Sequence, residues 1–291
     1  MKLTIFTPTY NRAYILENLY RSLQLQNCHD FEWLIVDDGS EDDTEALVRG
    51  WMNEDNSFPI RYYKQENGGK HRAINRGLEL AQGELFFTVD SDDYLTPDAL
   101  EKIIIWEAEL PKDGSYCGLA GNLGTAPNET PNRIFSEPYM DGTALDRYRK
   151  IDGERAMVFF TEVHRRYLYP TFPGEKFMTE AVTWNRMAHD GYRMRFFNDI
   201  IWIYEYREDG LTKAGNKLFM RNPRGYGLFL LEKTEFLGDS KVMLLYTLTC
   251  EMSKQYSARE IASFLNAPRP LIVAIIATHK LIHVMRKWVR K

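Results

Sequence analysis

Several features that define large classes of protein are scarce in this chain of 291 residues. Its three cysteines, Cys28, Cys117 and Cys250, are widely spaced and odd in number. That pattern excludes a disulfide framework and a Cys-x-x-Cys metal or redox site, and it is typical of a reducing compartment. A net charge of −4, with 44% hydrophobic and 27% charged residues, argues against a disordered or nucleic-acid-binding protein. We therefore expect a globular protein with a sizeable core.

Long hydrophobic stretches are also missing, since crossing a bilayer takes roughly 18 to 20 apolar residues. Met1–Tyr10 leads directly into a strand-like pattern without a secretion signal, so we expect a cytoplasmic protein. The segment 270–291 combines an apolar run, Leu271–Ala277, with a basic end and no acidic residue. Two interpretations of this segment stay open. It can lie on the inner face of the cell membrane as an interfacial helix, or pack on the main domain or on a second copy in a homodimer.

The first part of the chain alternates between short apolar stretches and segments with helical spacing. Strand-like stretches occur at 3–6, 31–36, 60–64 and 85–89, and helical spacing at 13–25, 44–52 and 71–81. Apolar strands between helices predict a mostly parallel sheet that is covered on both faces. Ligands of such sheets bind beyond the carboxyl ends of the strands, so function is expected there.

Three aspartates follow the fourth strand in the turn Asp90–Asp93. Carboxylates this close repel one another unless a cation or strong donors compensate. Oxygen ligands suit Mg²⁺ or Mn²⁺, which bind through one or two carboxylates plus substrate phosphates. A helix expected near Pro97 offers another interpretation, in which the acids only cap it, but Asp98 is already available for that. We therefore predict a divalent cation held by Asp90, Asp92 and Asp93.

The first two strands also end in polar segments. Thr7–Arg12 contains no glycine, which excludes the glycine-rich pyrophosphate loop of dinucleotide-binding proteins. It offers Pro8 to fix the backbone and Tyr10 to stack on a base. In the next turn, Asp38 can accept a hydrogen bond from a base imide or a ribose hydroxyl. Because no glycine cradle is present, a bound diphosphate needs a cation, and the three aspartates supply the place for one.

These motifs together resemble family 2 glycosyltransferases of the GT-A fold. The matching segments, in the family's order and spacing, are Thr7–Arg12, Val36–Ser40, Asn67–Lys70 with Ala73, Asn75 and Gly77, and Asp90–Asp93. The resemblance implies a Rossmann-like α/β sheet flanked by helices and an inverting transfer of a hexose-type sugar from a nucleotide sugar. UDP is the expected nucleotide, although the motifs also accommodate GDP or dTDP. The implied acceptor is a glycan or lipid-linked saccharide of a bacterial surface polysaccharide.

The resemblance also implies roles for single residues. The nucleoside pocket includes Pro8, Tyr10 and Arg12; Asp38 contacts the base; Lys70 or Arg72 approaches the donor; Asp92 and Asp93 hold the ribose and the metal-diphosphate unit. The segment Tyr204–Thr212 resembles the one that closes over the diphosphate, so Arg207 is expected to bind phosphate. It lacks the histidine that assists the metal in some members. His164 and His189 are expected to be ordinary surface or core residues.

Inverting transfer needs a general base that removes the proton of the acceptor hydroxyl. Residues 173–184 resemble the family's acidic motif at the start of a helix. Aligned on Trp184, Glu180 takes the base position, and Thr179–Glu180 replaces the commoner Glu-Asp pair. Glu175 is the alternative base, and either acid can instead favour a helix N-terminus.

Two other functions stay open from sequence alone. A nucleotidyltransferase would also use metal and carboxylates, but the first strand is not followed by a triphosphate loop rich in glycine and basic residues. A carbohydrate-binding protein on the same fold would not be an enzyme.

Beyond Pro111 we expect long loops at 121–138, a helix at 175–188, a strand at 194–206 and mostly helices from about Gly215. The expected domains are a transferase domain at 1–212, with a nucleotide-binding half at 1–110 and an acceptor-binding half at 111–212, and a helical region at 213–291.

Overall fold

The computed structural model describes residues 1–151, 153–205 and 211–289. The chain divides into two compact units, which we call the N-terminal unit (residues 1–169 and 183–210) and the C-terminal unit (residues 170–182 and 211–291). The sequence placed residues 170–182 in the acceptor-binding half, whereas the structure groups them with the C-terminal helices.

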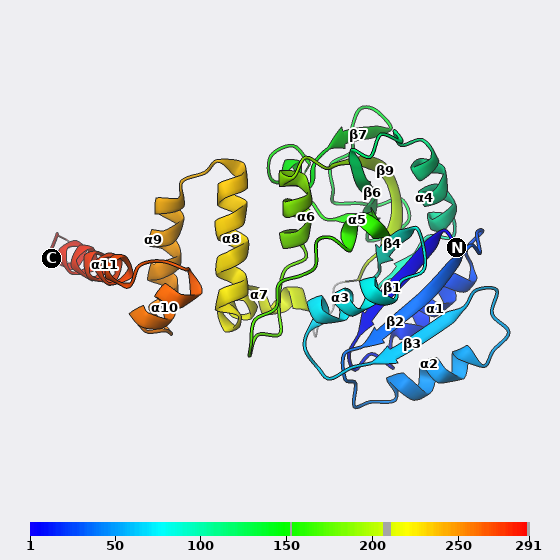
Figure 1. Cartoon of the computed structure of the whole chain (residues 1–291), viewed down its shortest axis with the longest axis horizontal. Coiled ribbons are helices and arrows are strands. Elements are labelled where there is room, and N and C mark those ends of the chain that lie inside the picture. Colours follow the sequence, from blue (N-terminus) through cyan, green and yellow to red (C-terminus); the bar gives the residue numbers. More distant parts are fainter. Residues whose placement is uncertain (152, 206–210, 290–291) are drawn as a thin grey trace. The chain divides into compact units, whose positions relative to one another are not determined.

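A sheet of nine strands forms the centre of the described N-terminal unit (Figure 1). The strands are β1 (Leu3–Thr9), β2 (Phe31–Asp37), β3 (Ile60–Lys64), β4 (Leu85–Thr88), β5 (Tyr94–Leu95), β6 (Tyr116–Gly124), β7 (Tyr139–Gly142), β8 (Arg155–Phe160) and β9 (Arg193–Ile203). Their order is β3-β2-β1-β4-β8-β6-β9-β5, with β7 paired to β9. Strands β1 to β4 are parallel, and β8 runs antiparallel to both β4 and β6. Strands β6 and β9 therefore point the same way as β1, which confirms the predicted mostly parallel sheet.

Helices cover both faces of this sheet, as strands without an exposed face require. One face carries α1 (Leu16–Gln24), α2 (Thr44–Met52) and α4 (Ala99–Ala108), and the other carries α3 (Lys70–Leu80), α5 (Thr161–His164), the 3₁₀ helix η1 (Ala144–Tyr148) and residues 183–189 of α6 (Ala181–His189). Alternation along β1 sends Leu3 and Ile5 to the first face and Phe6 to the second. There the Phe6 ring lies so close to Gly77 of α3 that a Cβ would sit 2.3 Å from it.

One expectation for the middle of the chain is wrong. Residues 121–124 belong to the buried strand β6 and not to a long loop. Glycines within β6 allow neighbouring atoms to approach closely: a Cβ on Gly118 would lie 2.0 Å from the Val158 carbonyl oxygen, and one on Gly121 would lie 2.5 Å from Ile201. Glycine in a strand interior can mark such an approach as well as a turn.

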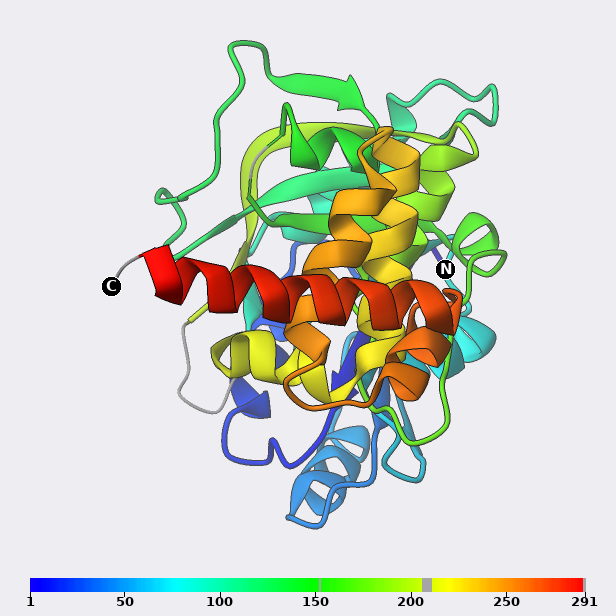
Figure 2. The ribbon, with the colours of Figure 1, turned by 90° about the vertical axis from the view of Figure 1, so that its left-hand side faces the viewer.

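The described residues of the C-terminal unit from 211 onward are mostly helical, as expected. Its helices are α7 (Leu211–Arg221), α8 (Pro223–Leu237), α9 (Lys241–Met252), α10 (Ala258–Phe264) and α11 (Arg269–Val289). They enclose a small core of their own that consists of Met220, Leu248, Met252, Ile261, Leu265 and Ile272. Helix α11 lies across α9 and contacts it (Figure 2). Among the described helices, none is both long and apolar enough to cross a membrane.

Candidate active site

The turns that follow β1, β2 and β3 are tied together at the carboxyl edge of the sheet. Asn11 donates its backbone N–H to the Ser40 hydroxyl (2.8 Å) and accepts from the Glu41 N–H through its side-chain oxygen (2.8 Å). Its φ of 53° is a left-handed conformation that asparagine tolerates better than most residues. Pro8 is buried within β1, while Tyr10 is 45% exposed beside this junction. The structure thus presents Tyr10 at the edge where the nucleoside was predicted.

Asp38 is buried, and both oxygens of its carboxylate accept hydrogen bonds from residues in the turn after β3. One oxygen accepts from the Gln65 side chain (2.7 Å) and the Gly68 N–H (3.0 Å). The other accepts from the Asn67 side chain (3.2 Å) and the Gly69 N–H (2.6 Å). A carboxylate offers about four lone-pair sites, so all are engaged. Asp38 therefore positions the glycine turn that begins α3, and its predicted contact with a base stays a prediction.

Asp37 closes the turn after β2. Its oxygens accept from the Ser40 N–H (2.6 Å) and from the Tyr62 hydroxyl (2.5 Å). Gly39 has a φ of +88°, and a Cβ there would lie 2.9 Å from the Asn67 nitrogen, so both conformation and space require glycine. The Asp37–Ser40 turn is a fully bonded element of the fold.

The turn after β4 is built differently. Asp93 is 9% exposed, and one of its oxygens accepts from the indole N–H of Trp202 (2.8 Å). Asp90 pairs with Lys70, at the start of α3, with 2.6 Å between Nζ and Oδ1. Asp92 lies between them and is partly buried. The sheet thus brings together Lys70 and the three aspartates that the sequence singled out.

The negative charges of these aspartates repel one another. Burial, with the negative charges of Asp90 and Asp92, raises the pKa of Asp93 to about 8. Burial and the Asp90 charge also raise the pKa of Asp92, and the positive charges of Arg12 and Lys70 offset this only in part. A pKa rises in this way when the ionised form lacks compensation. In the metal-free protein, the described groups around this turn therefore do not stabilise all three carboxylates in their ionised forms.

The chemistry of this turn fits a divalent cation. Carboxylate oxygens are the ligands that Mg²⁺ and Mn²⁺ prefer, and a cation would remove the repulsion that raises the pKa of Asp93. Within the described ranges, no three Asp, Glu, His or Cys side chains already converge as metal ligands. The three aspartates therefore do not form a complete cage, and one or two of them would share the ion with substrate phosphates, as is usual for Mg²⁺.

Two further predicted cationic residues lie at the start of neighbouring elements of this edge: Arg12 follows β1, and Arg72 belongs to the first turn of α3. Arg12 donates to the Tyr14 hydroxyl (2.9 Å), and its backbone N–H donates to Thr44 (3.2 Å). Arg72 donates to the Gly68 carbonyl oxygen, which stabilises the turn that Asp38 also holds. Arg207 lies outside the described residues.

The two candidate bases have different surroundings within the C-terminal unit. Glu175 is buried, and its two oxygens accept from the N–H groups of Arg224 (2.8 Å) and Gly225 (2.9 Å), in the first turn of α8. Glu180 directly precedes α6. The helix expected from residue 175 is wrong in its start, because Glu175 caps α8 and residues 175–180 are not helical.

Sequence reasoning missed several groups at the carboxyl edge. Trp202 lies 109 residues from Asp93, and no local pattern links them. Among the described residues, the Thr9 hydroxyl and the Nδ1 atom of His71 are buried without a hydrogen-bond partner. Burial and the neighbouring Arg72 lower the pKa of His71 to about 4. Their positions, at the end of β1 and the start of α3, are the signal that could have identified them. His164, as expected, is a core residue.

The chain is similar to known proteins in sequence and in fold. The model of the glycosyl transferase family 2 matches residues 4–171. The chain is 27% identical to the GalNAc(5)-diNAcBac-PP-undecaprenol beta-1,3-glucosyltransferase of Campylobacter jejuni over 235 residues, which is 77% of this chain and 72% of that protein. Its fold is similar to Staphylococcus aureus TarS 1-349 in complex with UDP-GlcNAc (TM-score 0.63, 18% identity, 95% of this chain, 88% of that one). It is also similar to the Pyrobaculum calidifontis mannosyltransferase PcManGT with GDP-Man and Mn²⁺ (TM-score 0.57, 22% identity, 96% and 75%).

Proposed function

The chain belongs to glycosyl transferase family 2, and we propose that it is a metal-dependent, inverting glycosyltransferase whose donor is a UDP-sugar. The observation that carries this proposal is the crowded, incompletely neutralised acid turn Asp90–Asp93 at the carboxyl edge of the sheet. A Mn²⁺ or Mg²⁺ ion bound there would stabilise the negative charge of the departing diphosphate. TarS, a structural neighbour with UDP-GlcNAc, supports UDP, and PcManGT, with GDP-Man and Mn²⁺, supports the metal.

The donor is held by residues of the N-terminal unit. Asp92 supplies a metal ligand together with Asp90 or Asp93. Lys70 and Arg12 supply positive charge to the diphosphate, since both already act on the acid turn. We further propose that the ring of Tyr10 stacks on the base, that Pro8 and Asp38 shape the nucleoside pocket, and that Arg207 adds a phosphate contact.

Glu180 is the proposed general base. Its carboxylate takes the proton of the acceptor hydroxyl while the hydroxyl oxygen bonds to the anomeric carbon and the bond to the diphosphate oxygen breaks. Attack from the face opposite the leaving group inverts the anomeric configuration. The bonding of Glu175 supports this choice, because both its oxygens already hold the N-terminus of α8.

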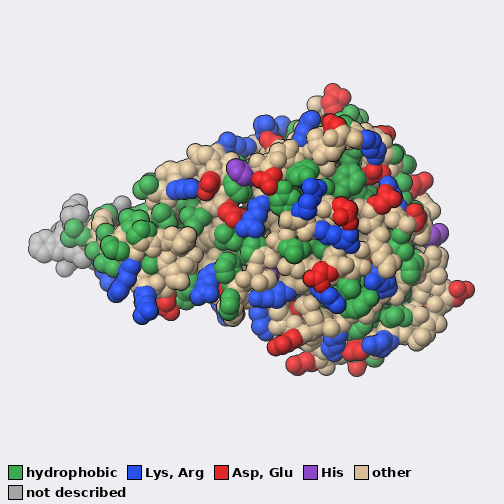
Figure 3. Space-filling view, viewed as in Figure 1, with side chains coloured by type: hydrophobic (Ala, Val, Ile, Leu, Met, Phe, Trp, Pro, Cys, Tyr) green, Lys and Arg blue, Asp and Glu red, His purple; other side chains and the backbone are tan. Residues whose placement is uncertain are grey.

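The proposed acceptor is a hydroxyl of a glycan or lipid-linked saccharide in cell-surface polysaccharide synthesis. The Campylobacter jejuni relative supports it, because its name includes an undecaprenol-linked saccharide. Helix α11 exposes Leu271, Val273 and Leu281, the last at 60%. Hydrophobic and Lys or Arg side chains share the visible surface of the C-terminal helices (Figure 3). Since residues 269–291 contain no acid, we propose that α11 rests on the anionic inner face of the cell membrane.

Donor turnover tests the catalytic proposal without knowledge of the acceptor. Wild type is incubated with UDP-, GDP- and dTDP-hexoses, with and without Mn²⁺. In the absence of an acceptor, water takes its place, and the nucleoside diphosphate that this hydrolysis releases is measured. We expect release from UDP-sugars only with metal. Release that does not require metal would contradict the proposed metal dependence. Pyrophosphate release from a nucleoside triphosphate and a sugar phosphate would indicate a nucleotidyltransferase instead.

Vesicle binding tests the membrane proposal separately. We expect wild type to co-sediment with phosphatidylglycerol vesicles and to bind phosphatidylcholine weakly. Leu281→Glu should reduce binding, whereas Ile134→Glu should not, because Ile134 is similarly exposed (54%) in the N-terminal unit. Equal binding by the two variants would contradict the role of α11. Dimers that Leu281→Glu dissociates, in light scattering, would assign the helix to a second copy.

A further inference from the structure

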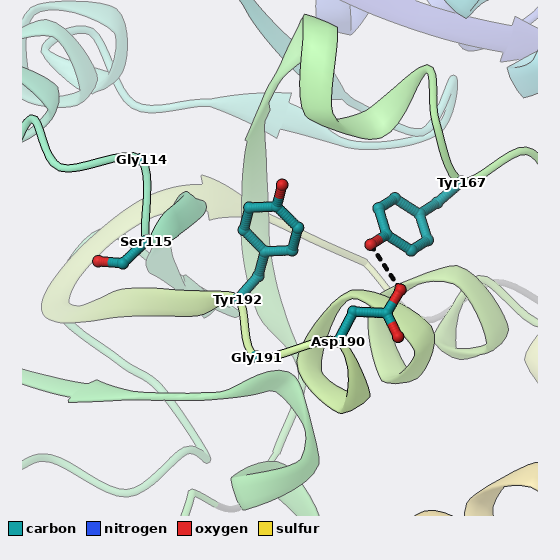
Figure 4. Close-up of a pocket in the computed structure, with 6 residues that line it drawn as sticks. All are labelled: Gly114, Ser115, Tyr167, Asp190, Gly191 and Tyr192. Carbon is teal, nitrogen blue, oxygen red and sulfur yellow. Dashed lines mark hydrogen bonds between the residues drawn. The ribbon is translucent and has the colours of Figure 1, made fainter.

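A cavity that is open to solvent lies in the N-terminal unit, away from the acid turn. It has a volume of about 340 Å³ and is lined by Gly114, Ser115, Tyr167, Asp190, Gly191 and Tyr192 (Figure 4). This volume falls near the lower end of the range of small-molecule sites, about 300 to 1,000 Å³. Three separate segments meet here: the turn before β6, the chain after α5 and the turn between α6 and β9.

Topology places this cavity at the opposite edge of the sheet from the donor residues. Ser115 and Tyr192 immediately precede β6 and β9, which run in the same direction as β1. Asp38 and Asp90 instead follow the carboxyl ends of β2 and β4. Since β6 has nine residues, about 30 Å of strand separates the two edges. A ligand in this cavity would not touch the metal or the diphosphate.

Two partly buried tyrosine rings and one exposed carboxylate line the cavity. The rings of Tyr167 and Tyr192 are nearly perpendicular (88°), with 6.2 Å between their centroids. The Tyr167 hydroxyl donates to one Asp190 oxygen at 2.7 Å (Figure 4). In the described part of the chain, the second Asp190 oxygen and the Tyr192 hydroxyl have no hydrogen-bond partner. The cavity therefore offers an aromatic surface, an open acceptor and an open hydroxyl.

The charges around the cavity favour a neutral ligand. The guanidinium of Arg166 lies 5.7 Å from the centroid of the Tyr192 ring, so that ring already has a cation beside it. A second cation would be repelled by it. Asp190 inside the cavity, with Asp113 bonded to Ser115 at its rim (2.6 Å), would repel an anion. A neutral molecule with an apolar face and several hydroxyls meets neither obstacle.

The rim is shaped by backbone rather than by bulky side chains. Gly114 and Gly191 have φ values of +78° and +95°, and a Cβ at either position would meet nothing within 4 Å. These glycines are therefore required for their left-handed conformation and not for packing. They leave the mouth of the cavity open to a ligand that extends out of it, as a chain of sugars would.

We propose that this cavity is a saccharide-binding subsite that holds a neutral pyranose ring of the glycan acceptor or product, remote from the catalytic centre. The ring's C–H face packs on Tyr192, and its hydroxyls donate to Asp190 and bond to the Tyr192 hydroxyl. The assignment to acceptor or product rests on the proposed function. Anchoring a glycan at a second site raises its effective concentration at the first, provided that the chain is long enough to reach both.

Saturation-transfer NMR tests this directly with four neutral disaccharides: N,N′-diacetylchitobiose, cellobiose, lactose and maltose. We expect at least one to bind wild type, with affinity reduced at least tenfold in Tyr192→Ala and less in Asp190→Asn. Asp92→Asn, in the donor site, should bind the same disaccharide as well as wild type. Absence of signal from all four, or equal binding by Tyr192→Ala, would overturn the proposal, as would preferential binding of choline, which would indicate a cation site.

Two further measurements keep these outcomes separable. If Tyr192→Ala does not fold, as judged by circular dichroism, Ser115→Trp replaces it, because a large side chain there fills the cavity and leaves Tyr192 in its packing. UDP binding with Mn²⁺ is measured on the same samples. Disaccharide binding without UDP binding would sustain the subsite and contradict the proposed function. UDP binding without disaccharide binding would support the proposed function and contradict the subsite.

Discussion

Two acidic turns lie at the same edge of the sheet and differ in how far protein groups stabilise their negative charges. In the turn after β2, Asp37 accepts two hydrogen bonds and Asp38 accepts four, all from protein donors. In the turn after β4, Asp93 accepts from Trp202 and Asp90 pairs with Lys70, yet the pKa values of Asp92 and Asp93 remain raised. The aspartates of the first turn are therefore stabilised by protein donors, whereas those of the second turn are stabilised only in part.

This difference indicates that the two turns have different roles, one in the fold and one in ligand binding. A carboxylate that is bonded on all sides stabilises the fold, because removing it leaves several buried donors unsatisfied. A carboxylate whose charge is not compensated costs stability, and its repulsion falls when it takes up a proton or when a cation binds. We infer that the first turn shapes the nucleoside pocket and that the second binds the metal-diphosphate unit. Substitutions in the two turns should therefore move activity and stability in different directions.

The largest expected effect is on catalysis. Asp92→Asn should lower donor turnover about 10³-fold, because a metal ligand at the leaving group is lost. Its melting temperature should equal or exceed that of wild type, since the substitution removes a repelling charge. Asp55→Asn, an exposed acid distant from the acid turn in the sequence, is the control and should change neither quantity. A large loss of stability in Asp92→Asn would mean that the second turn is structural like the first.

The acceptor side offers the same contrast between a bonded and a reactive carboxylate. Glu180→Gln should reduce transfer about 10² to 10⁴-fold while UDP binding stays unchanged, as expected for loss of a general base. Glu175→Gln should retain activity and lose about 1 kcal/mol of stability, because it caps α8. Turnover and urea denaturation of the two variants distinguish them. An inactive Glu175→Gln that folds normally would reverse the assignment.

The first turn should respond through stability. Asp38→Ala removes the acceptor of four hydrogen bonds, two of them from Gly68 and Gly69 N–H groups. We expect a loss of about 3 kcal/mol in the free energy of unfolding, measured with urea. UDP binding should weaken as well, because the start of α3 shifts. A stable Asp38→Ala that fails only to bind nucleotide would show that this residue acts on the ligand and not on the turn.

The second turn should make stability depend on pH. The folded-state pKa of Asp93 is about 8, above the ordinary value of 3.8, so the folded protein holds a proton that the unfolded chain releases. The contribution of Asp93 to stability is therefore greatest below its ordinary pKa and is lost as pH rises through about 8. Between pH 6 and 8 we expect wild type to lose about 2 kcal/mol more than Asp93→Asn does, in urea titrations of metal-free protein. Parallel pH profiles of the two proteins would contradict the raised pKa.

Lys70 gives the smallest and most specific effect. Its ammonium pairs with Asp90 at 2.6 Å, so it competes with a metal ion for the acid turn. Lys70→Met should bind Mn²⁺ alone more tightly, by a few-fold, and UDP with Mn²⁺ about tenfold more weakly, because a diphosphate contact is lost. Lys64→Met, which removes a pair with Glu45 away from the turn, is the matched control. Changes of the same sign for both ligands would argue against competition.

Much of the donor half was predictable because its signals are local. Apolar strands followed by polar turns predicted a parallel sheet, and that topology brings Asp38 and Asp90 to one edge without knowledge of any contact. The same reasoning could not separate the two turns. Their difference depends on Gln65 and on Trp202, which reach them from other elements.

The later chain was harder because its signals conflict. Gly121 suggests a loop by residue type, yet it lies in the central strand β6 with close neighbours. Glu175 suggests a helix start, and it does cap a helix, but the helix is α8, whose first turn follows some fifty residues later. The cavity lined by Tyr167 and Tyr192 is formed by three segments that have no common motif.

The central claim is that the turn Asp90–Asp93 binds a metal-diphosphate unit. The most direct test is a calorimetric titration of UDP, with and without Mn²⁺, into wild type and Asp92→Asn. The account predicts that Mn²⁺ tightens UDP binding by wild type at least tenfold and that Asp92→Asn loses this gain while its metal-free affinity is unchanged. Equal UDP affinity of wild type with and without Mn²⁺, or an undiminished gain in Asp92→Asn, would contradict it.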